Sequence, residues 1–510
     1  IKSADIVALE TNPETWQQEM SEYSKALNKI ETTAPNARAT LANGFFVSNT
    51  FKYFKYEKWI ENVLQMSPAN INSLLYRSYG NNNSDFEEDT YLDLYLFQCG
   101  KRWGKQIVGV EDYNESMLLM AEAYRDAEND KNKRRVTYDR QSGFSSDRLQ
   151  ESYRTGNLDW LDSINYYNST SAAFDEKFMY KRNEIQAHSI DTIIRKGLSL
   201  FVGVGAAHLP GERGVIEMLR AKGYKLRPVQ MGARDSEHKS VVEKIRVPLK
   251  FNPWKTRDGL ITAMAPGELL LAGEEPGIEQ YHFADMANGS YYLLTRMMTS
   301  AWMWNHTAER VHEIVDSLLY ENIPGKIISR KNITRNGLQG IEVINRTRRG
   351  DMQRYQIYTS PFELLVFKMS GIGDYVTEGT EADTFFNSIT ISNPTSEKWI
   401  QFSPDNGGFS VDLPHPPYIG NDGSWIFDAY DPKLQTNYRV VRSDIHNYFF
   451  AEVDSFDLGL MEESFALSEF IEKRISRKNG KANGYPTLDV EYKDKSGKLL
   501  KVRFLLKGPH

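Results

Sequence analysis

The sequence predicts an α/β N-terminal domain with a partly parallel sheet flanked by helices, followed by two α+β domains built on antiparallel sheets. Over residues 1–248, apolar runs of strand length alternate with helical periodicity, which is typical of a sheet with crossover helices. After residue 249, short strands separated by turns dominate, and turn residues recur 147 positions apart. The 510 residues are enough for about three domains, which we place at 1–248, 249–395 and 398–510.

The strand candidates of the first domain are apolar runs at 5–9, 106–110 and 198–204. The last run, LSLFVGV, precedes a Gly/Pro loop, a helix near 214–222 and a further strand near 226–231. Two strands joined through a helix of this length form a parallel crossover, so at least part of the sheet is expected to be parallel.

The second and third domains read as two copies of one α+β unit. Asn336-Gly337 recurs as Asn483-Gly484, and Gly350 recurs as Gly497. Each copy is expected to carry one amphipathic helix. The apolar stripes of these helices are Val311, Ile314, Val315, Leu318 and Leu319 in the first copy, and Leu467, Phe470, Ile471 and Ile475 in the second. The second copy stops before counterparts of 364–367 and 384–389, and the chain opens on Ile1, so we expect a fragment truncated at both ends.

The composition excludes several classes of protein. A net charge of −6 and a pI near 6.0 exclude a chain-wide basic surface for nucleic acid. The sequence has no run of about 18 apolar residues, so no membrane span is expected. A single cysteine, Cys99, excludes an intramolecular disulfide and a metal site with several cysteines.

Reactive side chains follow each predicted strand of the first domain. Glu10 and Glu111 end two of the strands, and His208 follows the third. Because the carboxyl ends of parallel strands meet at one edge, we expect the three within roughly 10 Å of one another. This set suits a metal with oxygen and nitrogen ligands or a general acid–base pair. The alternative is that each side chain caps a helix or pairs with a nearby lysine.

Arg182 and Gly205 are the other informative positions near this edge. On a helix over 178–194, Arg182 shares an apolar face with Phe178 and Ile185, so it needs a carboxylate or an anionic ligand unless it extends to solvent. Glu10 or Glu111 would supply the carboxylate. The glycines of GVGAAH do not complete a dinucleotide fingerprint, and Gly205 instead suits a tight turn that brings backbone and imidazole into a crevice.

The segment FVGVGAAHLPGERGVIEMLRAKGYKLRPV at 201–229 resembles the TraB/PrgY/GumN family, whose members carry a closing Gly-x-x-His followed by Leu-Pro-Gly, a helix and Gly-Tyr. The resemblance extends over roughly residues 1–235. Its other landmarks are the strand ending in Glu10, YLDLYLFQCGKRWGKQIVGVE at 91–111, Tyr-Arg-Thr-Gly-Asn at 153–157, and the pair Arg182-Asn183.

The resemblance implies a fold like that of the erythromycin esterases and a relation to the Tiki proteases, which are metal-dependent hydrolases with two Gly-x-x-His motifs and a glutamate. It implies His208 and Glu10 as ligands of a divalent ion (Mn, Co or Zn). It also implies catalytic roles for Glu10, His208, Arg182 and Glu111. The residues that would shape the site are Gly205, Gly211, Tyr153, Arg154 and Asn183. The first Gly-x-x-His should precede Glu10, so these 510 residues are expected to be inactive without it.

The C-terminal copies resemble PsbP-like domains through Gly-Phe-Ser-Val-x-x-Pro at 408–414 and Phe-Phe-Asn-Ser at 385–388. Such domains bind protein partners. The leading hypothesis is therefore a bacterial, peptidase-like, metal-dependent hydrolase with appended binding modules and a peptide or protein substrate. The alternatives are a non-catalytic protein that binds a peptide or signal on the same fold, and metal-free hydrolysis by a Glu/His pair. The family resemblance favours an extracytoplasmic location, with any signal segment upstream of residue 1.

Overall fold

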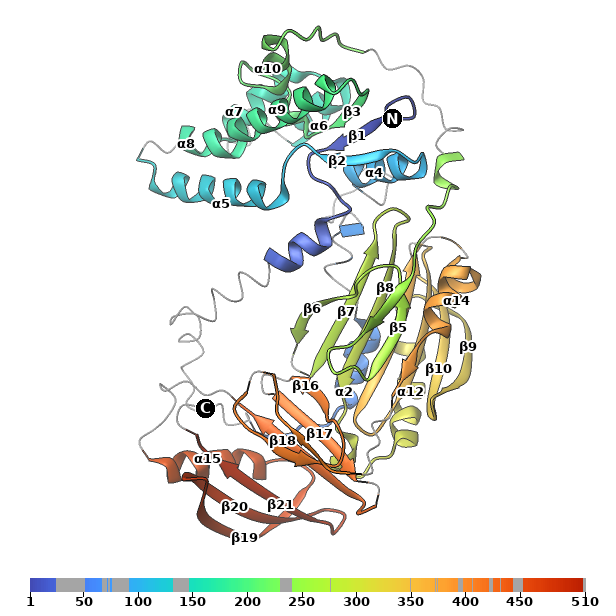
Figure 1. Ribbon diagram of the computed structural model, residues 1–510, viewed down its shortest axis with the longest axis vertical. Helices are drawn as coiled ribbons and strands as arrows, with labels where there is room; N and C mark the ends of the chain where they lie inside the picture. Colours follow the sequence, from blue (N-terminus) through green and yellow to red (C-terminus); the bar gives the residue numbers. More distant parts are fainter. Residues whose placement is uncertain are drawn as a thin grey trace. The chain divides into compact units, whose positions relative to one another are not determined.

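The computed structural model describes most of the chain and divides it into two compact units (Figure 1). The first unit comprises Ile1–Ala26, Ser73–Pro248 and Met286–Gly289, and the second comprises Leu27–Asn72, Leu249–Asp285 and Ser290–His510. The described residues are 1–23, 51–66, 71, 74–75, 91–131, 146–229, 241–275, 277–348, 350–371, 373, 375–392, 398–405, 407–421, 425–431, 433–443 and 453–507.

The first unit is built on a parallel three-stranded sheet in the order β2-β1-β3. Its strands are β1 (Ile6–Leu9), β2 (Gln106–Gly109) and β3 (Leu200–Gly203), and Ile6 aligns with both Gln106 and Leu200. The three strands lie within the predicted runs, and the predicted parallel arrangement is confirmed. The central strand β1 is buried along its whole length, which explains why its four residues are all apolar.

Helices flank both faces of this sheet. They are α4 (Leu92–Arg102), α5 (Tyr113–Asn129), α6 (Ser146–Thr155), α7 (Leu158–Asn168), α8 (Ala172–Asp175), the π-helix η2 (Glu176–Tyr180), α9 (Lys181–Arg195), the 3₁₀ turn η3 (Ala206–His208) and α10 (Val215–Ala221). A Cβ on Gly100 of α4 would lie 2.6 Å from Ile107 and 3.2 Å from Val7, so glycine lets α4 approach one face closely. On the other face, Ala8 packs with Ala187 and Ile190 of α9.

The predicted strand near 226–231 is not formed within the part that the structure describes, which runs to residue 229. After α10, Gly223 ends the helix with a φ of 95°, as predicted for a C-cap. The hydroxyl of Tyr224 then donates to Asp191 of α9 at 2.7 Å, and Leu226 packs on the same helical core. Because these contacts direct the chain along α9, residues 224–229 do not join the sheet.

A seven-stranded antiparallel sheet forms the centre of the second unit, in the order β6-β7-β8-β12-β11-β10-β9. Its strands are β6 (Leu270–Glu275), β7 (Ile278–Asp285), β8 (Ser290–Met298), β9 (Lys326–Arg335), β10 (Leu338–Arg346), β11 (Met352–Thr359) and β12 (Glu363–Gly371). The hairpin predicted between 341–345 and 355–358 is the β10–β11 pair.

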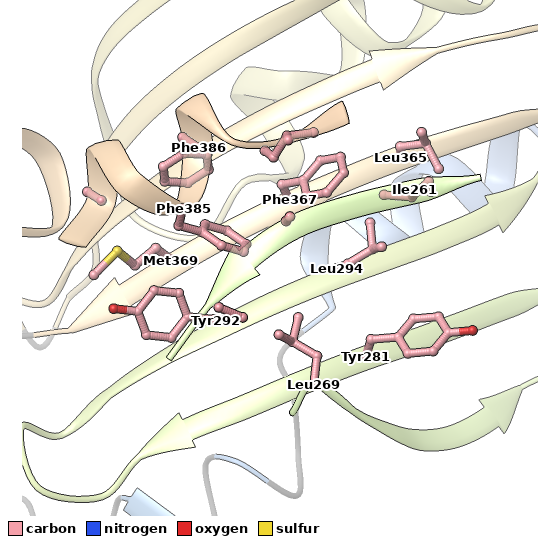
Figure 2. Close-up of a cluster of buried hydrophobic side chains, with 14 of the residues drawn as sticks. Ile261, Leu269, Tyr281, Tyr292, Leu294, Leu365, Phe367, Met369, Phe385 and Phe386 are labelled. Atoms are coloured by element: carbon pink, nitrogen blue, oxygen red, sulfur yellow. The ribbon is translucent and has the colours of Figure 1, made fainter. Parts of the chain in front are cut away.

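Two cores cover the two faces of this sheet. On one face lie α13 (Tyr375–Glu378), α14 (Thr380–Asn387) and the small sheet of β4 (Asn252–Lys255), β5 (Ile261–Ala265) and β13 (Thr390–Ile391). Figure 2 shows that core, with Phe385 and Phe386 of α14 against Phe367 of β12. On the other face α12 (Ala308–Asn322) packs on β10 and β11. Its apolar stripe is the predicted one, and Thr307 caps its N-terminus.

Residues 51–66 belong to the second unit, although they lie early in the chain. The helix α2 (Glu57–Gln65) packs on α12, and Ile60 and Leu64 share a core with Val315 and Leu319. A segment within the predicted domain 1–248 therefore contributes to the core of the second unit. The division into three domains stays a prediction.

Residues 400–505 repeat the order of elements from β4 to β11. They form β14 (Ile400–Phe402), β15 (Val411–Leu413), β16 (Tyr418–Asn421), β17 (Trp425–Asp431), β18 (Thr436–Arg442), α15 (Asp454–Ala466), β19 (Ile471–Ala482), β20 (Tyr485–Asp494) and β21 (Leu499–Leu505). The turns match as well, because Asn336 and Asn483 have φ values of 48° and 50°, and Gly337 and Gly484 have 81° and 86°. We call 252–371 copy 1 and 400–505 copy 2.

The helix predicted from Leu467, Phe470, Ile471 and Ile475 is wrong. The helix of copy 2 is α15, which ends at Ala466, and Ile471 and Ile475 lie in β19. β19 pairs with β20 in an antiparallel hairpin closed by Asn483-Gly484. The spacing of these apolar residues also fits a helix face, but the ladder of the hairpin decides the conformation. No helix among the described residues is long and apolar enough to cross a membrane.

Candidate functional site

The three predicted residues meet at the carboxyl edge of the parallel sheet. Glu10 follows β1, Glu111 follows β2 after Val110, and His208 lies on η3 just after β3. The backbone NH of Glu111 donates to the carbonyl of Glu10 at 2.9 Å, which extends the ladder to the site. One ligand atom from each of the three side chains lies within 4.8 Å of the others. The predicted convergence is therefore present in the structure.

Arg182 of α9 binds both carboxylates. Its Nε donates to Glu111 Oε2 at 2.9 Å, and its terminal NH2 group pairs with Glu10. The guanidinium is 7% exposed, so it does not extend to solvent. Burial by itself lowers the pKa of Arg182, but Glu111 and Glu10 outweigh burial and raise the pKa above its ordinary value. The site thus contains two carboxylates and one permanently charged guanidinium.

Glu111 is held from three sides. Its side chain is 1% exposed and accepts hydrogen bonds from Arg182, from the hydroxyl of Ser116 and from the amide of Gln186. Sequence reasoning missed Ser116 and Gln186. Gln186 lies one helical turn after Arg182, so the i, i+4 spacing was the signal that would have found it. A buried carboxylate with this many donors is fixed in position.

The imidazole of His208 has a defined orientation. Asn183 donates from Nδ2 to the carbonyl of Arg213 at 2.8 Å, so its Oδ1 faces His208 Nδ1 at 2.6 Å. Because that oxygen only accepts, Nδ1 carries the proton and Nε2 presents its lone pair. Nε2 lies 3.8 Å from Glu10 Oε1. Burial lowers the pKa of His208, and Glu10 opposes this only in part, so the ring is neutral at neutral pH.

Gly205 permits the close approach of Glu10 and His208. Its backbone NH donates to Glu10 Oε2 at 3.2 Å, and its carbonyl accepts from the NH of His208 at 2.9 Å. A Cβ at this position would lie 3.3 Å from Glu10 Oε2 and 3.4 Å from the imidazole. The predicted tight turn at Gly205 is therefore present, with a backbone NH directed at Glu10.

Residues 1–228 match the model of the TraB/PrgY/gumN family. We call this segment the TraB-like region. It contains Glu10, Glu111, Arg182 and His208, and it covers almost the same range as the resemblance seen in the sequence.

The second part of the chain is similar to a solved structure. The solution structure of cyanobacterial PsbP (CyanoP) from Synechocystis sp. PCC 6803 matches with 14% identity, covering 28% of this chain and 92% of that chain, with a TM-score of 0.22. This neighbour is consistent with the PsbP resemblance of the C-terminal part. No curated protein matches the chain significantly.

Tyr153 and Arg154, two of the other predicted site residues, lie in the last turn of the helix α6. Arg154 is 78% exposed and pairs with Glu151, and Tyr153 is 57% exposed. Among the described residues, no hydrogen bond or ion pair joins either of them to Glu10, Glu111 or His208. Their motif marks the end of α6, because Gly156 has a φ of 67° and Asn157 caps α7. Gly211 has a φ of 87°, in the turn before α10.

A pocket of about 440 Å³ reaches the cluster on the β2 side of the TraB-like region. Its lining includes Glu111, Glu19, Asp112 and Tyr113. Burial raises the pKa of Glu19. Asp93 of α4 is a further acidic group near the cluster, and burial followed by the charge of Glu10 raises its pKa. The acidic lining suits a ligand that donates hydrogen bonds, as backbone amides of a peptide do.

Proposed function

We propose that the TraB-like region is a metal-dependent hydrolase that cleaves amide bonds in peptides. The observation that carries this proposal is the set of ligand atoms from Glu10, Glu111 and His208 within 4.8 Å of one another. The match to the TraB/PrgY/gumN family over this region agrees with it. A pocket next to Glu111 offers space for a substrate side chain.

The residues fit a divalent ion that prefers oxygen and nitrogen ligands, which includes Mn²⁺, Co²⁺ and Zn²⁺. Nε2 of His208 presents a lone pair, and Asn183 holds the other ring nitrogen, as an outer partner of a ligating histidine does. Sequence reasoning counted two protein ligands, His208 and Glu10. Glu111 makes three, the number that catalytic zinc sites usually use.

The chain's own residues would orient and activate the reacting water. A bound divalent ion would lower the pKa of that water. Glu10 is 27% exposed, against 1% for Glu111, so Glu10 is the carboxylate that a water can reach and the one that accepts its proton. Arg182 and the NH of Gly205 hold the two oxygens of Glu10 in place. Glu111 stays anchored by its donors.

Metal-free hydrolysis by Glu10 and His208 is the second candidate, and Arg182 favours it. The guanidinium neutralises part of the negative charge that attracts a cation, because it contacts both carboxylates. A neutral His208 beside Glu10 is then a proton acceptor without any ion.

Metal binding tests the proposal independently of activity. Co²⁺ absorption or Mn²⁺ resonance, titrated on the 510-residue protein, should report one bound ion. Glu10→Gln and His208→Ala should weaken binding about 10-fold or more, since each removes a ligand. The matched control is His188→Ala, because His188 is an exposed histidine on α9 and should leave binding unchanged.

Cleavage of unstructured peptides separates the candidates. Metal-stimulated cleavage that is lost in His208→Ala supports the proposal. Cleavage that chelators leave intact, but that His208→Ala abolishes, moves the assignment to the Glu/His pair. Peptide binding without cleavage, abolished by His208→Ala or Arg182→Ala, would show a binding protein and overturn both hydrolase assignments.

A further inference from the structure

The loop between His208 and α10 is fastened to η2 and α9 through Arg213. The Nη1 and Nη2 groups of Arg213 donate to the two carboxylate oxygens of Glu176 at 2.6 and 2.9 Å, and Nη2 also donates to Glu184 at 3.2 Å. The guanidinium carbon lies 4.3 Å from the centre of the Tyr180 ring. The contact with Glu176 is the two-pronged geometry that an arginine makes with a carboxylate and that a lysine cannot reproduce.

The three partners of Arg213 form one stripe along the helices. Glu176 and Tyr180 belong to the π-helix η2 and Glu184 lies in α9, so they follow one another at a spacing of four residues. Side chains four residues apart lie on the same face. A backbone NH at the end of η2 donates to the carbonyl of Glu176 five residues back, and such π turns are frequent at functional sites. The stripe therefore lies where η2 passes into α9, the helix that carries Asn183.

The contacts of Arg213 fix a position more than they add stability. The side chains of Arg213, Glu176 and Glu184 are 41%, 54% and 44% exposed, and exposed ion pairs contribute little unless they are bidentate or form a network. Arg213 meets both conditions. The pKa of Glu176 is lowered, and the hydrogen bond from Arg213 is the largest cause. We call Arg213, Glu176, Tyr180 and Glu184 the Arg213 clasp.

The loop that the Arg213 clasp holds is tightly folded. The NH of Gly214 donates to the carbonyl of Gly211 at 3.0 Å, and a Cβ on Gly214 would lie 2.1 Å from the carbonyl oxygen of Pro210. Because the chain turns this closely, the side chain and the backbone of Arg213 have little freedom to move apart. The guanidinium therefore fixes the carbonyl of Arg213 as well.

The carbonyl of Arg213 sets the orientation of the Asn183 amide. It accepts from Nδ2 of Asn183 at 2.8 Å, which leaves Oδ1 facing Nδ1 of His208 at 2.6 Å. A side-chain amide that turns through half a rotation exchanges its oxygen and its NH2 group without changing shape. The carbonyl of Arg213 distinguishes the two orientations, because it accepts from the NH2 group and would repel the oxygen.

The two orientations of the amide select different tautomers of His208. With Oδ1 of Asn183 facing the ring, Nδ1 carries the proton and Nε2 presents its lone pair, 3.8 Å from Glu10 Oε1. With the NH2 group facing the ring, Nδ1 must accept and Nε2 carries the proton instead. In that tautomer Nε2 can neither bind an ion nor accept a proton. The amide thus decides whether His208 can take part in either candidate reaction.

We propose that Arg213 is a positioning residue for His208. Its side chain holds the loop on η2 and α9, its carbonyl sets the amide of Asn183, and the amide fixes the tautomer of the imidazole. Arg213 acts through Asn183 and touches neither a substrate nor an ion. The consequence for metal binding rests on the proposed function, whereas the tautomer itself can be measured without any ion.

Imidazole ¹⁵N NMR measures the tautomer directly. The 510-residue protein, labelled with ¹⁵N-histidine and kept in EDTA at pH 8.5, should show His208 with a protonated Nδ1 and an unprotonated Nε2. The signals of His208, one of nine histidines, are assigned by their loss in His208→Ala. Arg213→Ala should shift them towards the form with a protonated Nε2. The matched control is Arg220→Ala, because Arg220 pairs with Glu217 on α10 and is 48% exposed, and it should leave the signals unchanged.

Asn183→Asp tests whether the effect passes through the amide. A carboxylate offers only acceptors, so it faces Nδ1 of His208 correctly without help from the carbonyl of Arg213. Asn183→Asp should therefore restore the tautomer with a protonated Nδ1 in the Arg213→Ala protein. Arg213→Lys keeps the charge but loses the two-pronged contact, so it should give an intermediate spectrum. The affinity for Co²⁺ should follow the tautomer and fall about 10-fold in Arg213→Ala.

An unchanged His208 spectrum in Arg213→Ala would overturn the proposal. A shift that Asn183→Asp does not restore would overturn it too, because it would show a general loosening of the loop. If Arg213→Ala does not fold, Glu176→Gln combined with Glu184→Gln weakens the clasp from the other side, and the same two outcomes decide. A tautomer that shifts and is restored in a protein that binds no Co²⁺ would support the positioning role and contradict only the metal-dependent assignment.

Discussion

Arg182 is the residue on which the geometry of the candidate site depends. It holds Glu10 and Glu111 together through two ion pairs, in which Arg182 and Glu111 are buried and Glu10 is partly exposed. A buried ion pair contributes little net stability, but it is costly to break, because the remaining charges stay buried. Arg182 therefore serves to position the two carboxylates beside a neutral imidazole. Burial also lowers the pKa of His282 in the second unit, and no ion pair of His282 is formed among the described residues.

His282 predicts a loss of stability in acid. Burial lowers its pKa to about 4, whereas the unfolded value is 6.5. The unfolded chain binds the proton more tightly than the folded chain does. The stability that goes with a neutral His282 is therefore fully present above pH 6.5 and is lost as pH falls towards 4. Between these two pH values the free energy of unfolding should fall by about 3 kcal/mol. Urea unfolding of the second unit at pH 7.5 and pH 4.5 should show it, and His282→Gln should lessen the pH dependence. Identical pH profiles for the two proteins would contradict the argument.

At the scale of elements, hairpin turns decide more than apolar spacing does. The stripe of Ile471 and Ile475 fits a helix face, yet both residues lie in β19 because the chain reverses at Asn483-Gly484 and pairs with β20. The same turn in copy 1 separates β9 and β10. A two-residue turn of this type requires positive φ at both positions, which asparagine and glycine tolerate.

Gly484 and Gly337 should therefore respond alike to substitution. Their φ values are 86° and 81°, and no atom lies within 4 Å of an added Cβ at either position. The cost of Gly484→Val or Gly337→Val comes from the backbone alone and is about 1–2 kcal/mol. Gly→Asn at the same positions should cost less, since asparagine visits this conformation. Hydrogen exchange in β19–β20 and β9–β10 would measure the loss of stability at the two positions. A large cost in only one copy would show that the turns are not equivalent.

At the scale of the whole molecule, the two units are assembled from interleaved segments of the chain. Residues 51–66 lie inside the TraB-like region, but they pack in the second unit with α12. Tyr56 is buried there, its hydroxyl lies 2.7 Å from His306 Nδ1, and its ring contacts Trp304 edge to face.

Tyr56→Ala should consequently destabilise the second unit and spare the first. Truncating a buried aromatic side chain costs about 3–5 kcal/mol, while Tyr56→Phe removes only the hydrogen bond and costs about 1 kcal/mol. Hydrogen exchange should accelerate in α12, β10 and β11, with β1 and β3 unchanged. Trp59→Ala is the control, because Trp59 lies on the same helix and is 38% exposed. Equal acceleration in β1 and β3 would show that the two units unfold together.

The sequence alone determined those features that local chemistry controls. Strands that end in Glu10 and Glu111, and a glycine turn before His208, predicted one shared edge, because parallel strands align their carboxyl ends. Recurring Asn-Gly turns predicted the copies, because these residues select one backbone conformation. Only the tertiary structure decided the rest. The bridge from Arg182 to both carboxylates, the contact of Gln186 with Glu111 and the place of 51–66 in the second unit depend on residues distant in the chain. Such contacts leave no periodic pattern in the sequence, since packing and pairing partners are chosen only when the chain folds.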